Sequence, residues 1–224
     1  MSISPKAALL EEYALVARAL SAPARLMLLE QIAQGERGVE ALADKTGLTI
    51  ANTSQHLQAL RRAGLVTSRR EGKSVLYCLS DAMTLSLMDL IRVVAERNLA
   101  QVERILRGLS DGADAPEPVS REDLALRMAD GSVTILDVRP ADEFAMGHIL
   151  SARNVTLADL ESIALTLDPS TDIVAYCRGP YCVDAHQAIT VLRKRGLNAR
   201  RLEGGFPEWF AEGRPIHEQF RSMV

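Results

Sequence analysis

The sequence predicts two domains, a mainly helical one followed by an α/β domain with a parallel sheet. Apolar residues recur at helical spacing through the first half, whereas β-type runs such as SVTILDV and DIVAYC alternate with helical stretches in the second. Between them, LSDGADAPEPVSRED mixes Gly, Pro, Asp and Ser with almost no large apolar residue. We therefore expect domains over residues 1–110 and 122–224, joined by a linker over 111–121.

Composition and charge limit the class of protein. The chain of 224 residues is 47% hydrophobic, and no apolar run approaches the roughly 20 residues that cross a bilayer. Three cysteines cannot all pair, and the N-terminal segment lacks the basic head and apolar core of a signal peptide. We expect a soluble cytoplasmic protein with no membrane partner. Residues 1–110 hold 14 Lys and Arg against 11 Asp and Glu, whereas residues 111–224 hold 12 against 18, which hints at nucleic-acid contact by the first half.

The first half reads as a series of helices with one tight turn. Helical periodicity predicts helices over about residues 5–20 and 23–34. In VEALADKTGLTIANTSQHLQALRRAGLV, Gly47 breaks the chain and Thr49 can cap a second helix. The apolar face of that helix comprises Thr53, Leu57 and Leu60. Two helices around a tight glycine turn describe a helix-turn-helix.

A hairpin and a long helix follow. The segment LVTSRREGKSVLYCLS has β-prone arms over residues 65–68 and 74–79 around Arg-Arg-Glu-Gly-Lys, which predicts a hairpin with a basic tip. Residues 81–107 predict one long helix with more apolar surface than a small core needs. We expect a homodimer that forms through this helix and the N-terminal one.

The segments ALSAPARLMLLEQIAQGE and LADKTGLTIANTSQHLQALRRAGLVTSRREGKSVLYCLS resemble the winged helix-turn-helix repressors of the ArsR/SmtB type, over most of residues 19–80. The resemblance implies a repressor whose partner is a double-stranded DNA operator. Six residues of the second helix lie off its apolar face and would read base edges in a major groove: Ile50, Ala51, Asn52, Ser54, Gln55 and Gln58. Phosphate contacts, or a minor-groove contact at the hairpin tip, are expected from Arg61, Arg62, Arg69, Arg70 and Lys73.

The same resemblance raises the question of metal sensing. Repressors of this family commonly sense metals through paired cysteines in the first helix of the motif, and here that segment, GERGVEALAD, contains none. Cys78 has no cysteine neighbour, and we expect it to be a small buried hydrophobe. We expect no metal site in this domain and no cofactor, so the signal must be sensed elsewhere in the chain.

The second half carries a different set of motifs over about residues 119–217. They are the LDVR of residues 136–139, Glu143, Phe144, Gly147, His148, Ile149, Ala152, Asn154, Gly204, Gly205, Phe206, Trp209, Gly213 and Pro215. This pattern resembles a single rhodanese domain. The resemblance implies a parallel sheet flanked by helices, with a catalytic cysteine in a loop between a central strand and the next helix. We expect Asp137, Arg139 and Glu143 to form a structural ion-pair framework, and Trp209 and His148 to serve in packing.

The local sequence independently places a reactive loop at YCRGPYC. Residues 173–176 form a short buried-type strand, Cys177 ends it, and a helix begins near Val183. A cysteine delivered to a helix N-terminus has a lowered pKa, because free amides and the helix dipole favour an anion. By the resemblance, Cys177 would hold sulfur as a persulfide, and Arg178 would attract an anionic donor. The loop that would cradle this sulfur comprises Gly179, Pro180, Tyr181 and Val183.

The sequence allows several interpretations of the chemistry of this loop. Phosphate or arsenate chemistry would need an arginine six residues after Cys177, where Val183 stands, so sulfur transfer is favoured. Cys182 is either a small side chain at the start of the helix or a resolving thiol that attacks a persulfide on Cys177. A metal site would need further ligands, of which His186 is one candidate, and we expect none.

Together these observations predict a homodimeric DNA-binding repressor with a sulfur-sensing domain. A sulfur donor such as thiosulfate, persulfide or polysulfide would load Cys177, and a Cys177/Cys182 thiol switch would release DNA. One alternative is a thiosulfate-type sulfurtransferase enzyme with an attached DNA-binding domain. Others are a regulator that responds to arsenic or another oxyanion, and a ligand-binding module with little turnover.

Overall fold

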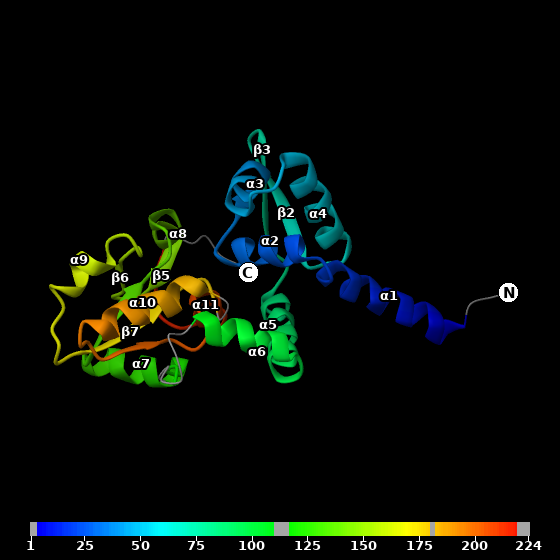
Figure 1. The fold of residues 1–224 in the computed structure, drawn as a ribbon. Helices are drawn as coiled ribbons and strands as arrows, with labels where there is room; N and C mark the ends of the chain where they lie inside the picture. The colour runs from blue at the N-terminus through cyan, green and yellow to red at the C-terminus, as the bar shows by residue number, and fades with distance from the viewer. Residues whose placement is uncertain (1–3, 110–116, 180–181, 219–224) are drawn as a thin grey trace. The chain divides into compact units, whose positions relative to one another are not determined.

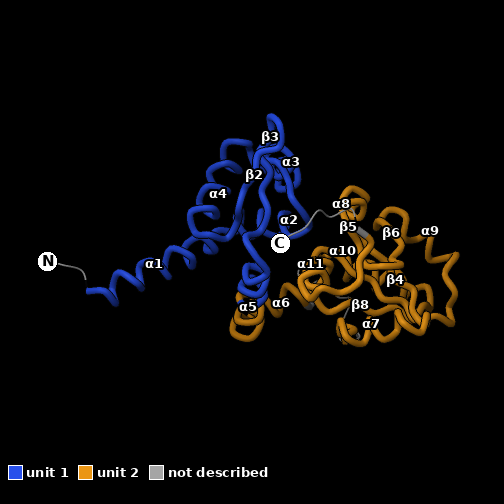
Figure 2. Tube along the Cα trace, turned by 180° about the vertical axis from the view of Figure 1, so that it is seen from behind, with its two compact units in different colours: residues 1–90 blue, residues 91–224 orange. Residues whose placement is uncertain are grey.

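A computed structural model describes residues 4–109, 117–179 and 182–218. The chain divides into two compact units, Met1–Leu90 and Ile91–Val224 (Figure 2). This division falls inside helix α5 (Ala82–Asn98), upstream of the predicted linker.

The first part of that linker, residues 111–116, lies outside the described residues. The sequence assigned Val119 to the linker, but Val119 is buried and forms a parallel bridge to Leu202. The α/β fold therefore begins before residue 122.

The described residues of the first unit form a series of helices and a small sheet, and they end in the start of a longer helix (Figure 1). In chain order its elements are α1 (Pro5–Leu20), α2 (Pro23–Ala33), β1 (Arg37–Gly38), α3 (Val39–Thr46), α4 (Ile50–Arg62), β2 (Val66–Glu71), β3 (Ser74–Leu79) and the beginning of α5. The strands form an antiparallel sheet in the order β1-β3-β2. Within the described residues, no helix is both long and apolar enough to cross a membrane.

The predicted helix-turn-helix is confirmed by α3 and α4. Gly47 ends α3 with a φ of 68°, a left-handed conformation that glycine adopts without strain. Thr49 caps α4, because its side-chain oxygen accepts a hydrogen bond from the Asn52 backbone N–H at 3.2 Å. The predicted inner face of α4 is buried, and the core around it comprises Leu28, Leu29, Ile32, Leu42, Thr53, Leu57 and Leu60.

The hairpin differs from the prediction at its tip. Strand β2 continues through Glu71, which pairs with Ser74, so the turn contains only Gly72 and Lys73. Gly72 has a φ of 60°, as a tight two-residue turn requires. Arg69 and Arg70 therefore lie on the strand and not at the tip, because ladder pairing extends as far as the turn residues allow.

The predicted single helix over residues 81–107 is wrong in its continuity. The structure has two helices, α5 and α6 (Ala100–Leu109), which are interrupted at Leu99. Asn98 ends α5 and its side-chain amide donates a hydrogen bond to the Val94 carbonyl at 2.7 Å. Asparagine side chains that bond the backbone in this way compete with the helical ladder.

The second unit is a sheet covered by helices on both faces. After α6, its elements are α7 (Arg121–Asp130), β4 (Val133–Asp137), α8 (Ala141–Met146), β5 (Gly147–Ile149), β6 (Arg153–Asn154), α9 (Leu160–Ala164), β7 (Asp172–Tyr176), α10 (Val183–Lys194), β8 (Ala199–Arg201), α11 (Phe206–Ala211) and β9 (Ile216–Glu218). The main sheet is parallel with the order β6-β4-β7-β8, and β5 pairs with β9 in a separate ribbon.

Alternation along β7 assigns its side chains to two cores. Ile173, Ala175 and Cys177 belong to the cluster that contains the buried residues of α9 and α10. Val174 and Tyr176 belong to the cluster that contains Leu124 of α7 and residues of α11. Because successive side chains of a strand point to opposite faces, the sheet carries one core on each face. Cys177 therefore lies on the same side as α10.

Leu57→Ala should destabilise the first unit alone. Leu57 is fully buried in α4, and truncation of a buried leucine costs about 2–5 kcal/mol. The single tryptophan, Trp209, is buried in the second unit, so its fluorescence reports that unit while circular dichroism reports all helices. In urea, we expect part of the dichroism transition to move to lower concentration and the Trp209 transition to stay. Leu126→Ala, which changes an exposed leucine, is the control; a shifted Trp209 transition would contradict the prediction.

Candidate functional site

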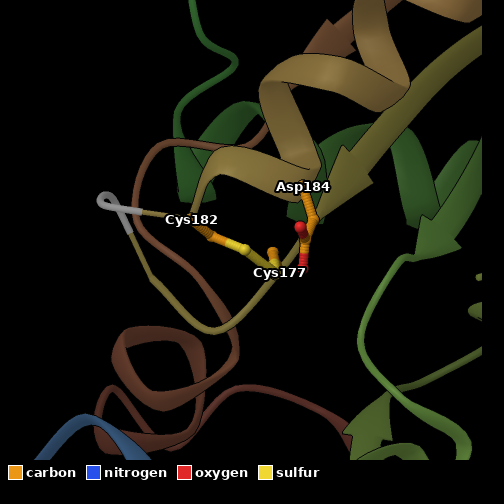
Figure 3. A group of neighbouring side chains, drawn as sticks. All are labelled: Cys177, Cys182 and Asp184. Atoms are coloured by element: carbon orange, nitrogen blue, oxygen red, sulfur yellow. A yellow bond between two sulfur atoms is a disulfide. The ribbon is translucent and has the colours of Figure 1, made fainter. Parts of the chain in front are cut away.

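The two cysteines of the YCRGPYC loop meet where β7 gives way to α10. Cys177 follows the last residue of β7, and Cys182 is the N-cap of α10. Their sulfur atoms are joined in a disulfide, with the α-carbons 6.1 Å apart (Figure 3). Both residues are buried, with 1% of Cys177 and 7% of Cys182 exposed. The expectation that the loop brings these α-carbons within reach of a disulfide is met in this structure.

The backbone at the start of the loop is held by the segment that begins α11. The Phe206 N–H donates to the Cys177 carbonyl at 3.1 Å, and the Gly205 N–H donates to a Glu208 carboxylate oxygen at 2.8 Å. A Cβ at Gly205 would lie 2.5 Å from the Cys177 carbonyl oxygen and 2.6 Å from the Gly179 Cα. Only glycine fits at this position, because the two backbone segments touch.

Arg178 is engaged by carboxylates on either side. Its guanidinium forms a bidentate ion pair with the buried carboxylate of Glu143, in which Nε and Nη2 lie 2.8–3.1 Å from the two oxygens. Its Nη1 lies 4.0 Å from Asp184. The sequence assigned Arg178 to an anionic donor and Glu143 to a structural framework, whereas the structure pairs them with each other.

Asp184 is a site residue that the sequence reasoning missed. It lies in the first turn of α10, and its carboxylate and the two cysteine sulfurs all lie within 4.8 Å of one another (Figure 3). An acidic residue two positions after Cys182, at a predicted helix start, was the available signal. Negative side chains are favoured there by the helix dipole.

The predicted framework of Asp137 and Arg139 is confirmed. Both side chains are fully buried and paired, with Arg139 Nη2 2.6 Å from Asp137 Oδ2. The same nitrogen donates to the Gly147 carbonyl at 2.7 Å, and the guanidinium stacks 4.2 Å from the centre of the Phe206 ring. Trp209 is also fully buried, as a packing residue, and donates to the Pro215 carbonyl at 2.9 Å.

The cluster of Cys177, Cys182 and Asp184 also has the residue types of a metal site. Both sulfurs are consumed by the disulfide, and three ligands fall short of the four that a structural zinc site needs. Nδ1 of His186, the further ligand that the sequence offered, donates to the Cys182 carbonyl at 3.2 Å. Burial lowers the pKa of His186, so its imidazole is uncharged near pH 7.

The structure describes some of the remaining loop residues and not others. Pro180 and Tyr181 lie outside the described residues, so the predicted amide cradle is not tested. The Cys182 N–H donates a hydrogen bond to the Gly179 carbonyl at 3.1 Å. Val183 begins α10 and is 37% exposed, so it lies outside the core face that holds Ala185, Ala188, Ile189 and Leu192.

The predicted DNA-reading helix presents its polar face to solvent. Ile50, Ala51, Asn52, Gln55 and Gln58 of α4 are exposed and Ser54 is half-buried, while the opposite face is in the core. Arg61 and Arg62 at the end of the helix are exposed too. The structure thus brings these side chains to one face of the first unit.

The basic residues of the hairpin are not equivalent. Arg69 is paired with Glu36 at 2.5 Å and with Glu71 at 3.0 Å, and these bonds raise its pKa above its usual value. Arg70 and Lys73 are exposed. Cys78 is half-buried and not fully buried as predicted; its sulfur lies 3.0 Å from Thr67 Oγ1.

Each half of the chain matches a known protein family. Residues 22–68 match the model of the bacterial regulatory protein arsR family, and residues 120–212 match that of the rhodanese-like domain. The chain is 42% identical over 214 residues to the HTH-type transcriptional regulator Rv0324 of Mycobacterium tuberculosis, covering 95% of this chain and 93% of that protein. The chain belongs to the ArsR family. It is a transcriptional regulator of that family with a C-terminal rhodanese-like domain.

Solved structures match each domain of this ArsR-family regulator separately. A homodimeric winged helix-turn-helix domain, Mb0332 of Mycobacterium bovis, is 42% identical with a TM-score of 0.41 and covers 44% of this chain and 92% of that one. A rhodanese-related protein of Thermoplasma volcanium is 25% identical with a TM-score of 0.41 and covers 46% of this chain and 98% of that one.

Gly205→Ala should displace the cysteine loop of the regulator. The added methyl group overlaps the backbone at Cys177 and Gly179, and overpacking of this kind costs about 1–3 kcal/mol. We expect a lower urea midpoint by Trp209 fluorescence and less Cys177–Cys182 disulfide at a fixed thiol–disulfide ratio, measured by intact mass. The control is Gly108→Ala in α6, where a Cβ has no atom of the described residues within 4 Å. An unchanged disulfide fraction would contradict the prediction.

Proposed function

We propose that this regulator is a repressor that senses sulfane sulfur through a thiol switch in its rhodanese-like domain. The observation that carries the proposal is the Cys177–Cys182 disulfide, which lies in the loop to which the resemblance to rhodaneses assigns sulfur chemistry. A carrier cysteine needs no bonded neighbour, whereas a switch needs one. The partner thiol at the N-cap of α10 favours sensing over repeated turnover.

Two steps convert the reduced form to the disulfide form. The Cys177 thiolate attacks the terminal sulfur of a donor R–S–SH, the donor S–S bond breaks, and RS⁻ leaves as Cys177 becomes a persulfide. The Cys182 thiolate then attacks Cys177 Sγ, forms the disulfide and expels HS⁻. Two cysteine thiols are oxidised by two electrons and the transferred sulfur is reduced to sulfide, so no other oxidant is needed.

In the disulfide form, the site cannot react with a sulfur donor. Cys177 is 1% exposed, and its sulfur is bonded to Cys182, so a further donor cannot react there until a thiol reduces the bond. The site therefore responds once to each exposure to sulfur and is reset by reduction. This behaviour suits a sensor.

DNA binding in this proposal belongs to α4 and the β2–β3 hairpin. The exposed amide side chains of α4 would read base edges, and Arg61, Arg62, Arg70 and Lys73 would contact phosphates. Arg69 would contribute less, because Glu36 and Glu71 already compensate its charge.

The repressor would act as a homodimer. Leu9, Leu10 and Tyr13 of α1 are more than half exposed and lie on one helix face, and Met83, Leu90 and Val94 form a similar stripe along α5. Apolar stripes of this size on two helices support burial against a second copy. Within the second unit α6 contacts α10, the helix that Cys182 caps, which offers a route from the loop to the α5–α6 region.

Cysteine variants separate the steps of the switch. After reduction and exposure to a hydropersulfide, intact mass should show the loss of two hydrogen atoms for the wild type. Cys182→Ser should instead gain one sulfur atom, because no thiol resolves the persulfide, and Cys177→Ser should show neither change. In gel shifts with the DNA upstream of its own gene, the wild type should lose affinity at least about fivefold on exposure, and Cys177→Ser should not.

The control is Cys78→Ser, which keeps both loop cysteines and should behave as the wild type does. A Cys177→Ser protein that still releases DNA on exposure to the donor would overturn the sensing proposal. Continuous production of sulfide at constant DNA affinity would support an enzyme with an attached DNA-binding domain.

Two substitutions test the DNA surface. Gln55→Ala should weaken binding to the operator by about 1–3 kcal/mol and leave binding to unrelated DNA unchanged, because an amide reads base edges. Arg70→Ala should weaken both and lower the slope of log affinity against log salt by about 1. Fluorescence anisotropy at several salt concentrations measures both effects. Equal losses on both DNAs for Gln55→Ala would remove α4 from sequence reading.

A further inference from the structure

The charges around the cysteine loop bear on which sulfur donors can react there. Thiosulfate and a hydropersulfide both carry transferable sulfur, but they differ in charge. Thiosulfate is a dianion, whereas the reacting S–SH form of a hydropersulfide is neutral. The sequence does not distinguish between these two donors, and it predicts that Arg178 attracts an anionic donor.

Arg178 does not present an uncompensated positive charge to the loop. Its guanidinium is held by both oxygens of Glu143 and lies 4.0 Å from Asp184. One cation thus faces two carboxylates, which leaves this group of three side chains with a net charge of −1. The buried position of Glu143 holds the pair in place, because a buried carboxylate that lost its partner would be strongly destabilising.

The positive end of α10 is also compensated. A helix N-terminus attracts anions through its free amides and dipole, and this effect underlies the expectation of an anion site in the loop. Asp184 lies in the first turn of α10, and its carboxylate is within 4.8 Å of both sulfurs. His186, further along the same helix, adds no positive charge, because burial lowers its pKa below the usual value.

We infer that Cys177 accepts uncharged sulfane-sulfur donors of the hydropersulfide class and rejects dianionic thiosulfate, with Asp184 as the residue that determines this selectivity. This inference rests on the proposed function, since it presumes that Cys177 accepts sulfur. With thiosulfate, the Cys177 thiolate would attack the outer sulfur and sulfite would leave, so two more negative charges would approach Asp184 before the S–S bond breaks. With R–S–SH, only the thiolate that leaves becomes charged.

The test compares donors on the reduced full-length protein. Intact mass follows loss of the reduced form with thiosulfate and with 2-hydroxyethyl hydropersulfide, and each rate is divided by that of free cysteine with the same donor. This division removes the intrinsic reactivity of the donor. We expect the normalised rate with thiosulfate to be lower by about tenfold or more, the size of effect that one charge produces at this distance in a partly solvated site.

Asp184→Asn should raise the normalised thiosulfate rate about tenfold and change the hydropersulfide rate by less than about twofold. Asp44→Asn is the matched control, because it removes the same charge from an exposed position on α3 in the other unit. A second measurement needs no variant. Added salt should accelerate the reaction of the wild type with thiosulfate and leave the hydropersulfide reaction unchanged, because salt screens repulsion between charges.

The outcomes distinguish the donor selectivity from the thiol switch itself. Equal normalised rates for the two donors, or an Asp184→Asn variant without selective gain for thiosulfate, would overturn the inference and leave the thiol switch standing. Failure of both donors to modify Cys177 would overturn the proposed function, and the donor selectivity with it. Saturable zinc binding by the reduced wild type that Asp184→Asn abolishes, without loading by either donor, would replace sulfur sensing by metal binding.

Discussion

The buried ion pair of Asp137 and Arg139 is the constraint on which the two-cysteine site depends. It joins the end of β4 to neighbouring segments, since Arg139 also donates to the Gly147 carbonyl and Asn154 donates to the Asp137 and Arg139 carbonyls. The Arg139 guanidinium packs on the ring of Phe206, and the Phe206 N–H donates a hydrogen bond to the Cys177 carbonyl. A buried pair is not a source of stability by itself, but removal of one partner leaves an unpaired charge. The pair therefore defines where the cysteine loop begins.

From that anchor, each part of the loop follows from contacts with a different element. Gly205 admits the backbone of Cys177 and Gly179 because it has no side chain, and α10 supplies Cys182 at its N-cap. Glu143 of α8 fixes Arg178. The result is a pair of thiols that lie close enough to bond, in surroundings whose positive charge is already compensated by carboxylates. Such a site suits a reversible covalent change better than the tight binding of an anion.

In the helical unit, too, packing and ion pairs determine which side chains stay exposed. Its core residues fix α3 and α4 so that one face of α4 stays in solvent, and the short turn at Gly72 and Lys73 ends the hairpin. Glu36 and Glu71 compensate the charge of Arg69, and its neighbour Arg70 is exposed. In both units, the way in which carboxylates compensate the arginines determines which charges remain for function.

The sequence by itself determined the two domains, the helix-turn-helix with its Gly47 turn and Thr49 cap, and the position of Cys177 between a strand and a helix. These features depend on periodicity and on residues close together in the chain, which a single sequence displays. It misjudged the hairpin tip and the break at Leu99, where backbone pairing and one side-chain hydrogen bond decide. Only the tertiary structure decided that Arg178 pairs with Glu143, that Arg69 pairs with Glu36, and that Asp184 approaches both sulfurs. Partners such as Glu143 and Arg178 are far apart in sequence, so packing selects them.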